Sequence, residues 1–172
     1  MKQVVAASAA LGTLPNKLPQ GVYYGGAWHR SSSQQIPVYS PSTGQEVAKV
    51  DSAGEEELEA AVKAATAGQK IWAKTIPLER SRVMREAASK IKEHKEELAR
   101  LDALDSGNSL RGMLFDVDIA VTLMEFFAGL ATEIKGETVP VGAGKVNYVV
   151  REPVGVVARI VPFNHPLMFA CA

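Results

Sequence analysis

Cysteine is almost absent from this sequence, because Cys171 is the single thiol among 172 residues. A lone thiol cannot close an internal disulfide or supply a multi-thiolate metal site, which excludes disulfide-stapled scaffolds and zinc-finger modules. We expect no metal site. The scarcity of thiols fits a reducing compartment, and the cytoplasm is the expected location.

A surplus of charge of either sign is also missing, since 19 Lys and Arg residues balance 19 Asp and Glu residues. Nucleic acids and anionic membranes are recognised through basic patches, so we expect neither as a partner. No stretch approaches the roughly 18 apolar residues that span a bilayer. The mildly apolar start of the chain is mostly alanine, so residues 1–21 are expected to form an N-terminal arm and not a secretory signal.

Two segments of the sequence have the residue pattern of β-strands. Residues 22–50 are rich in aromatic and β-branched residues between turn signals such as Gly25-Gly26 and Thr43-Gly44, which predicts a small antiparallel set. Alternation in "KVNYVV", residues 145–150, predicts one more strand.

Helical periodicity fills most of the middle of the chain. Ser52 and Glu55 have the spacing of a capping box and open a helix predicted over 52–73. A second helix is predicted over 77–105, because proline is favoured in a first turn, and a third, more apolar helix over 110–135.

The end of the chain combines a strand, a polar pair and a helix start. Residues 154–162, "VGVVARIVP", are almost continuously apolar, as in a parallel strand that helices cover on both faces. Asn164 and His165 follow, and Pro166 then opens a helix. Ligands of α/β proteins bind at the carboxyl ends of such strands, so the predicted fold class is α/β with a candidate site at this polar pair.

Residues 152–167, "EPVGVVARIVPFNHPL", closely resemble the segment of the NAD(P)-dependent aldehyde dehydrogenase superfamily written E-P-x-G-V-x-x-x-I-x-P-[WF]-N-x-P. Three other stretches are similar to landmarks of that family, in the family's order: "SPSTGQEVAKV", "LDALDSGNSL" and "FFAGLATEIKGETVP". The resemblance runs from about Val22 to the last residue and corresponds to roughly the first third of a family chain. It implies that residues 22–172 are the N-terminal part of a cofactor-binding domain, with the start of its parallel sheet.

The resemblance implies an oxidoreductase that oxidises an aldehyde to a carboxylic acid with NAD or NADP, through a cysteine thiohemiacetal. The family's nucleophilic cysteine and general-base glutamate would lie beyond Ala172, so the 172-residue chain alone is expected to be inactive. Cys171 follows the asparagine motif too closely to replace that nucleophile. The strands near 22–50 and 145–152 resemble the family's oligomerisation strands, which implies a homo-oligomer when the chain is complete.

Asn164 matches the family asparagine whose side-chain amide donates to the oxyanion of the tetrahedral adduct. From the residues alone, a second reading is equally open: asparagine is a good helix cap, and a helix starts at Pro166. The resemblance favours the oxyanion role.

The other site residues also come from the resemblance. In the family, the backbone of one segment runs along the nicotinamide ribose. The positions of that segment are matched by Ile160, Val161, Pro162 and Phe163. Positions lining the substrate tunnel are matched by Ile119, His165 and Met168. His165 departs from the usual Phe or Tyr and would make the tunnel more polar.

Two further points remain open. Asn108 and Ser109 stand where the family usually has Lys-Pro, which we interpret as a tolerated surface loop. A non-catalytic truncated fragment that acts at most as an interaction module is the alternative function. The coding region past Ala172 would separate the two, since a continued reading frame favours the enzyme.

Overall fold

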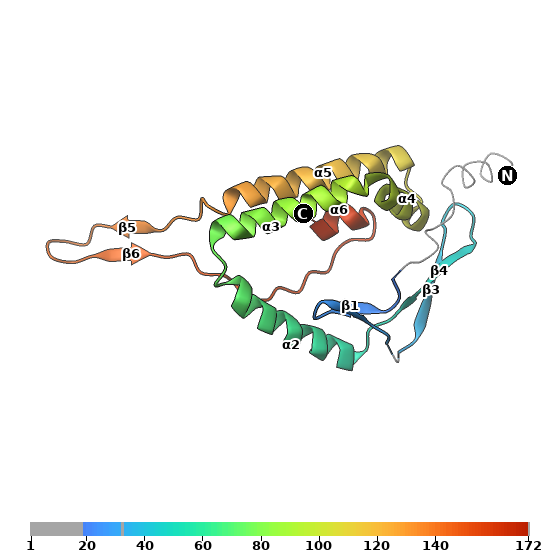
Figure 1. The fold of residues 1–172 in the computed structure, drawn as a ribbon, viewed down its shortest axis with the longest axis horizontal. Coiled ribbons are helices and arrows are strands. Elements are labelled where there is room, and N and C mark those ends of the chain that lie inside the picture. The colour runs from blue at the N-terminus through green and yellow to red at the C-terminus, as the bar shows by residue number, and fades with distance from the viewer. Residues whose placement is uncertain (1–18, 32, 172) are drawn as a thin grey trace.

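The computed structural model describes residues 19–31 and 33–171, so most of the arm predicted over residues 1–21 lies outside the described residues. The elements follow in the order β1 (Val22–Tyr24), β2 (Ala27–His29), β3 (Gln35–Tyr39), β4 (Glu46–Asp51), α2 (Glu55–Trp72), α3 (Pro77–Glu93), α4 (Lys95–Ser106), α5 (Leu110–Leu130), β5 (Glu137–Val139), β6 (Asn147–Val149) and α6 (Pro166–Cys171). In Figure 1, α3, α4 and α5 lie together, and α2 and the first strands lie across from them. The predicted mixture of helix and strand is confirmed.

The strands form antiparallel hairpins, β1 with β2, β3 with β4 and β5 with β6. Gly25 and Gly26 have φ values of 61° and 83° in the turn between β1 and β2, which matches a two-residue hairpin turn. The antiparallel set predicted for residues 22–50 is therefore confirmed. The strand predicted at 145–150 is also present, and its partner β5 lies across a loop in a hairpin that extends away from the body (Figure 1).

The first helix, α2, has its N-cap at Gly54, two residues after the predicted N-cap Ser52. The backbone N–H of Gly54 donates to Oε2 of Glu57 at 2.8 Å, and the Ser31 hydroxyl donates to the other oxygen of that carboxylate at 2.9 Å. Glu57 therefore joins the start of α2 to the segment that follows β2. The predicted box of Ser52 and Glu55 was wrong because Glu57, and not Glu55, is within reach of a backbone donor.

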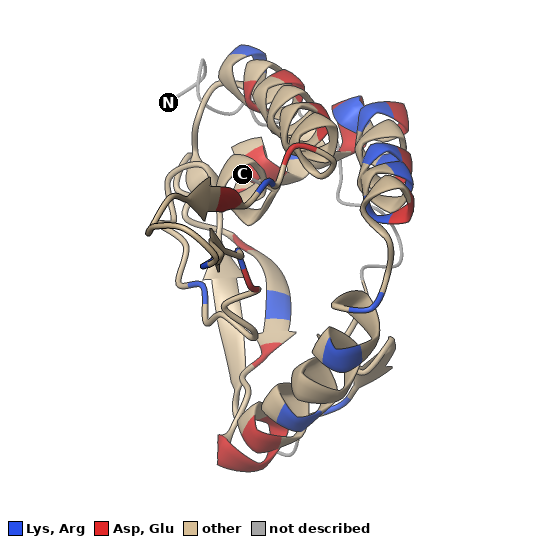
Figure 2. Cartoon of the chain, turned by 90° about the vertical axis from the view of Figure 1, so that its left-hand side faces the viewer, with Lys and Arg blue, Asp and Glu red and all other residues tan. Residues whose placement is uncertain are grey.

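The helix predicted over 77–105 is two helices that meet at His94, whose φ of −99° and ψ of 18° leave the helical range. The third predicted helix, α5, ends at Leu130 and not near residue 135. Figure 2 shows both signs of charge mixed along the helices. Within the described residues, no helix is long and apolar enough to cross a membrane.

The core lies around α5, which packs against α3 and α4, and one buried cluster between α4 and α5 consists of Ala99, Ala103, Met113 and Val117. Alanines on α4 let the two helices approach closely, and Met113 and Val117 of α5 fill the space between them. Leu167 of α6 packs against the same cluster. The short helix after the polar pair is thus fixed to the main helical layer.

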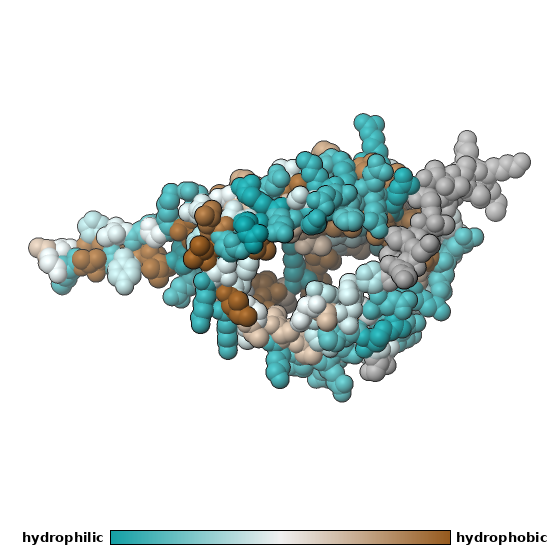
Figure 3. Space-filling model, viewed as in Figure 1, coloured by the Kyte–Doolittle hydropathy of each residue, from teal (hydrophilic) through white to brown (hydrophobic). Residues whose placement is uncertain are grey.

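The buried strand predicted over 154–162 is wrong for these 172 residues. The segment has neither strand nor helix, and it is open to solvent: Val154 is 94% exposed and Ile160 is 97% exposed. A parallel strand needs hydrogen-bonded neighbours and helices on both faces, and among the described residues none pairs with this segment. Its apolar side chains add to the exposed apolar surface that Figure 3 shows next to polar regions.

Candidate functional site

Asn164 lies in a turn between the exposed segment and α6. Phe163 and Asn164 are turn residues, and the carbonyl of His165 accepts the first hydrogen bond of α6 from the N–H of Phe169 at 3.0 Å. His165 therefore stands at the N-cap position, and Asn164 precedes it. Among the described residues, the Asn164 side chain has no hydrogen bond to the first turn of α6. The helix-cap reading of Asn164 is not supported by this geometry.

Three polar contacts attach this turn to the layer of α4 and α5. The Asn108 amide Nδ2 donates to the backbone carbonyl of Asn164 at 2.7 Å. The backbone N–H of Leu167 donates to Oδ2 of Asp102 at 3.1 Å. Nδ1 of His165 lies 2.5 Å from Oδ2 of Asp116. Consecutive parts of one turn are thus held by side chains from the end of α4, the loop after it and the first half of α5.

The contact between His165 and Asp116 is the most buried of the three. The Asp116 side chain is 8% exposed, and the His165 side chain is 37% exposed. Since a carboxylate only accepts, Nδ1 of His165 carries the proton of this hydrogen bond. The ring also meets Phe169 edge to face, with centroids 6.0 Å apart. These two contacts set the orientation of the imidazole.

The surroundings of Asp102 disfavour the charged form of its carboxyl. Burial raises the pKa of its carboxyl above the ordinary value of 3.8, and the N–H of Leu167 opposes that rise. The neighbouring carboxylates of Asp105 and Asp116 raise the pKa of Asp102 further. The charged form of Asp102 therefore lowers the stability of the folded chain while its oxygen holds α6.

Of the tunnel residues expected from the sequence, Ile119 lies on α5, Met168 lies on α6 and His165 lies at the N-cap of α6, and the two helices pack against each other. Ile119 is half-buried on α5, three residues after Asp116, and Met168 is half-buried on α6, three residues after His165. Three residues is nearly one helical turn, so each pair lies on one face of its helix. Among these tunnel residues, His165 makes a hydrogen bond to α5, through Asp116.

The segment expected along the cofactor is open and extended. Ile160 and Phe163 are 97% and 89% exposed, and Val161 and Pro162 are also exposed. Their backbone groups are outside any helix or sheet ladder, so they are available to a bound molecule. This exposed backbone lies directly before Asn164.

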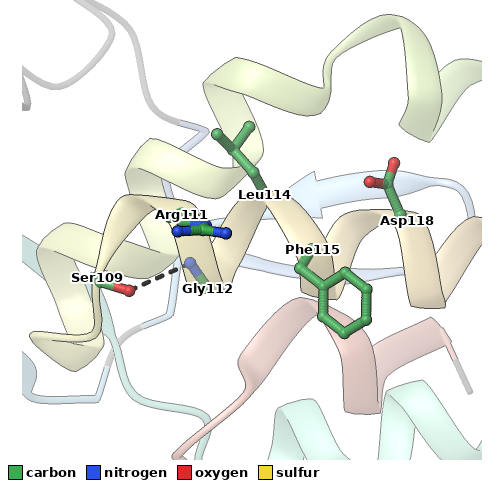
Figure 4. A pocket seen from close by; sticks show the side chains of 6 residues that line it. All are labelled: Ser109, Arg111, Gly112, Leu114, Phe115 and Asp118. Carbon is green, nitrogen blue, oxygen red and sulfur yellow. Dashed lines mark hydrogen bonds between the residues drawn. The ribbon is translucent and has the colours of Figure 1, made fainter.

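A surface hollow near the start of α5 is formed by other residues. Ser109, Arg111, Gly112, Leu114, Phe115 and Asp118 line it (Figure 4). Within it the Ser109 hydroxyl accepts from the N–H of Gly112 at 3.2 Å, as a helix N-cap does. None of the residues predicted for the site lines this hollow.

Cys171 is half-buried on α6, and burial raises the pKa of its thiol. A thiol with a raised pKa is a poor nucleophile, in keeping with the expectation that Cys171 has no catalytic role. Over the ranges that the structure describes, no group of three His, Cys, Asp or Glu residues could hold a metal ion.

Asn108, Asp102 and Asp116 were missed as site residues by the sequence reasoning. Asn108 belongs to the loop that we interpreted as a tolerated surface departure; residues 107–109 do form a loop, and from it the Asn108 side chain donates to the carbonyl of Asn164. The replacement of a usual lysine by asparagine was the available signal. Asp102 and Asp116 offered none, because their partners lie 65 and 49 residues away.

Comparison with known proteins identifies the same family throughout. The model of the aldehyde dehydrogenase family matches residues 28–172. The aldehyde dehydrogenase tropH of Talaromyces stipitatus is 37% identical over 159 residues, which are 90% of this chain and 31% of that protein.

Solved structures agree with the sequence comparison. PnpE in complex with nicotinamide adenine dinucleotide is 35% identical, with a TM-score of 0.86 over 90% of this chain and 32% of the other. A double mutant of betaine aldehyde dehydrogenase from Staphylococcus aureus, in complex with NAD+, is 31% identical, with a TM-score of 0.87 over 96% of this chain and 34% of the other. The chain thus spans about a third of the length of these relatives. On the family match and the shared fold, the chain belongs to the aldehyde dehydrogenase family.

Proposed function

We propose that this chain is the N-terminal part of an NAD(P)-dependent aldehyde dehydrogenase that oxidises an aldehyde to a carboxylic acid when the chain is complete. The observation that carries the proposal is the exposed Asn164, on a turn that three polar contacts fix to α4 and α5. We assign turnover to the longer protein only. The proposed reaction also needs a nucleophile and a water-activating base. We assign neither role to a residue of this chain.

Asn164 supplies a neutral hydrogen-bond donor in this proposal. When an aldehyde carbonyl is attacked, its oxygen becomes an oxyanion, and an amide N–H held in place stabilises the charge that appears. The bound cofactor would accept hydride from the adduct. The exposed backbone of residues 160–163 would bind the cofactor's ribose beside Asn164.

Ile119, His165 and Met168 line the route of the substrate in this proposal. Ile119 and Met168 supply apolar wall, and the His165 imidazole adds one polar group beside the buried carboxylate of Asp116. Ile119 on α5, Met168 on α6 and His165 at the N-cap of α6 thus lie on elements that pack against each other.

We also propose that the complete protein is a homo-oligomer that pairs through its hairpins. The β5–β6 hairpin extends from the body, and both of its strands are exposed over their whole length (Figure 1). Exposed strand edges are templates for pairing with another chain, which supports this assignment.

The first prediction tests the role of Asn164 in the complete enzyme. Asn164→Ala removes the donor, so kcat should fall by about a hundred- to a thousandfold, with little change in the dissociation constant for NAD. Asn164→Asp keeps the size of the side chain but places a negative charge near the oxyanion, and it should be at least as damaging.

Steady-state rates, cofactor binding and melting temperature are measured together for both variants. A normal kcat in Asn164→Asp would overturn the oxyanion role. A lower melting temperature with unchanged kcat would assign Asn164 a structural role instead.

A further inference from the structure

Asn108 is the residue that touches the Asn164 backbone directly. Its Nδ2 donates to the carbonyl oxygen of Asn164 at 2.7 Å, across 56 residues of sequence. Of the two polar atoms of the Asn108 amide, Nδ2 donates and Oδ1 only accepts, so Nδ2 faces the Asn164 carbonyl. The same Nδ2 lies 3.9 Å from the sulfur of Met113, a core residue of α5.

Asn108 is itself held firmly between two helix ends. Its backbone N–H donates to the Ser106 hydroxyl at 3.2 Å, and that hydroxyl donates to the carbonyl of Asp102 at 2.6 Å. On its other side, Ser109 caps α5 through Gly112. The last turn of α4 and the first turn of α5 therefore fix the backbone from which this side chain extends.

We propose that Asn108 is a positioning residue for Asn164. The inference rests on the proposed function, because it takes the Asn164 amide as the oxyanion donor. Asn108 does not touch the reacting atoms in this proposal. It fixes the peptide that joins Asn164 to His165, and through it the direction in which the Asn164 side chain leaves the backbone.

The other two contacts of the turn cannot replace this one. Asp116 holds the ring of His165, and Asp102 holds the backbone N–H of Leu167, so both act on residues after Asn164. The Asn164 residue is exposed and sits in a turn without ladder hydrogen bonds. A displacement of about 1 Å in a catalytic group can lower a rate about a hundredfold, so this single contact at Asn164 has a large effect on catalysis.

The test uses the complete enzyme. Asn108→Ala removes the donor, and Asn108→Asp replaces it with an acceptor of the same size. Both should lower kcat by roughly ten- to a hundredfold and leave the KM for the aldehyde and the dissociation constant for NAD nearly unchanged. Two variants are used because the charge in Asn108→Asp could hinder folding.

Ser109→Ala is the matched control, since it removes a helix cap in the same loop and leaves the contact between Asn108 and Asn164 in place. It should lower the melting temperature and keep kcat within about twofold of the unchanged enzyme. Loss of kcat in Ser109→Ala equal to that in Asn108→Ala would overturn the proposal, because any disturbance of the loop would then suffice.

A double-mutant cycle separates this inference from the proposed function. If Asn108 acts through Asn164, adding Asn108→Ala to Asn164→Ala should lower kcat by less than about twofold more. Independent, multiplying effects would overturn the positioning role. If Asn164→Ala alone leaves kcat unchanged, the proposed function fails. If Asn164→Ala lowers kcat and Asn108→Ala does not, the positioning role alone fails.

Discussion

Asp102 illustrates how a single residue of this site has two opposite effects. Its carboxylate accepts the backbone N–H of Leu167 and so holds α6, while burial makes its charged form unfavourable and raises its pKa. The hydrogen bond needs an acceptor and does not need a charge. A neutral oxygen in the same place could make the same contact.

The second prediction therefore concerns Asp102→Asn, which keeps the acceptor oxygen. A carboxyl whose pKa is raised in the folded state contributes stability below its unfolded pKa and loses it as the pH rises through the folded pKa. At neutral pH the variant should be at least as stable as the unchanged protein, and its advantage should shrink as the pH falls toward 3.8. Urea unfolding of the complete protein across this pH range measures the difference.

An advantage that grows as the pH falls would contradict this sign. A variant that is less stable at neutral pH would show that the charge of Asp102, and not its oxygen alone, holds Leu167.

The position of Asn164 was predictable from the residues around it, and its surroundings were not. Pro166 marks a helix start, and the resemblance implies an oxyanion donor two residues before it. The partners of the turn lie 49, 56 and 65 residues away. Contacts at such separation depend on how α4, α5 and α6 pack, which local sequence patterns do not specify.

Between α4 and α5, one glycine permits the sharp change of direction. Gly107 has a φ of 76°, in the left-handed region that L side chains avoid, and it follows the last residue of α4. A Cβ at this position would also lie 3.0 Å from Cβ of Pro41, in the loop between β3 and β4. The corner that carries Asn108 thus depends on a residue without a side chain.

The third prediction follows from this corner. Gly107→Ala should lower the free energy of unfolding by about 1–2 kcal/mol from the left-handed backbone alone, and more if Pro41 cannot move. Gly68→Ala is the matched control, because Gly68 lies inside α2 with open space around it and should gain up to about 1 kcal/mol. Urea unfolding of the complete protein compares the two. Equal effects at both glycines would contradict the role assigned to Gly107.

Helices were predicted more accurately than strand 154–162 for a physical reason. A helix bonds within its own segment, so an apolar stripe of period 3.6 in the sequence suffices to identify α2, α3 and α5. Their ends were less accurate, as the break at His94 shows. A parallel strand bonds to distant neighbours, and nothing in residues 154–162 supplies them.

Seen as a whole, the molecule exposes much apolar surface. Val154, Ile160 and Phe163 are 94%, 97% and 89% exposed, and large apolar residues at the end of α2 and along the hairpin are exposed as well (Figure 3). Large apolar side chains exposed in this number favour association. The small buried cluster between α4 and α5 does not cover them.

The fourth prediction is that the 172-residue chain, expressed alone, self-associates. In sedimentation velocity it should form species heavier than its 18.4 kDa monomer. Lysine at Val154 and Val157 should reduce this association, because both side chains are exposed and apolar. Lysine at the exposed Ala65 and Ala67 of α2 adds the same charge and should have a smaller effect. A sharp monomer that unfolds cooperatively would contradict the prediction.

The β5–β6 hairpin also affects the entropy cost of bringing the two halves of the site together. Gly136 lies against the carbonyl of Val149, so close that a Cβ would not fit, and the two ends of the hairpin therefore meet. Asp116 and His165 are 49 residues apart, but the hairpin forms locally and removes its own loop from that span. The contact between His165 and Asp116 therefore closes a shorter flexible loop than the sequence separation alone implies, which lowers its entropy cost.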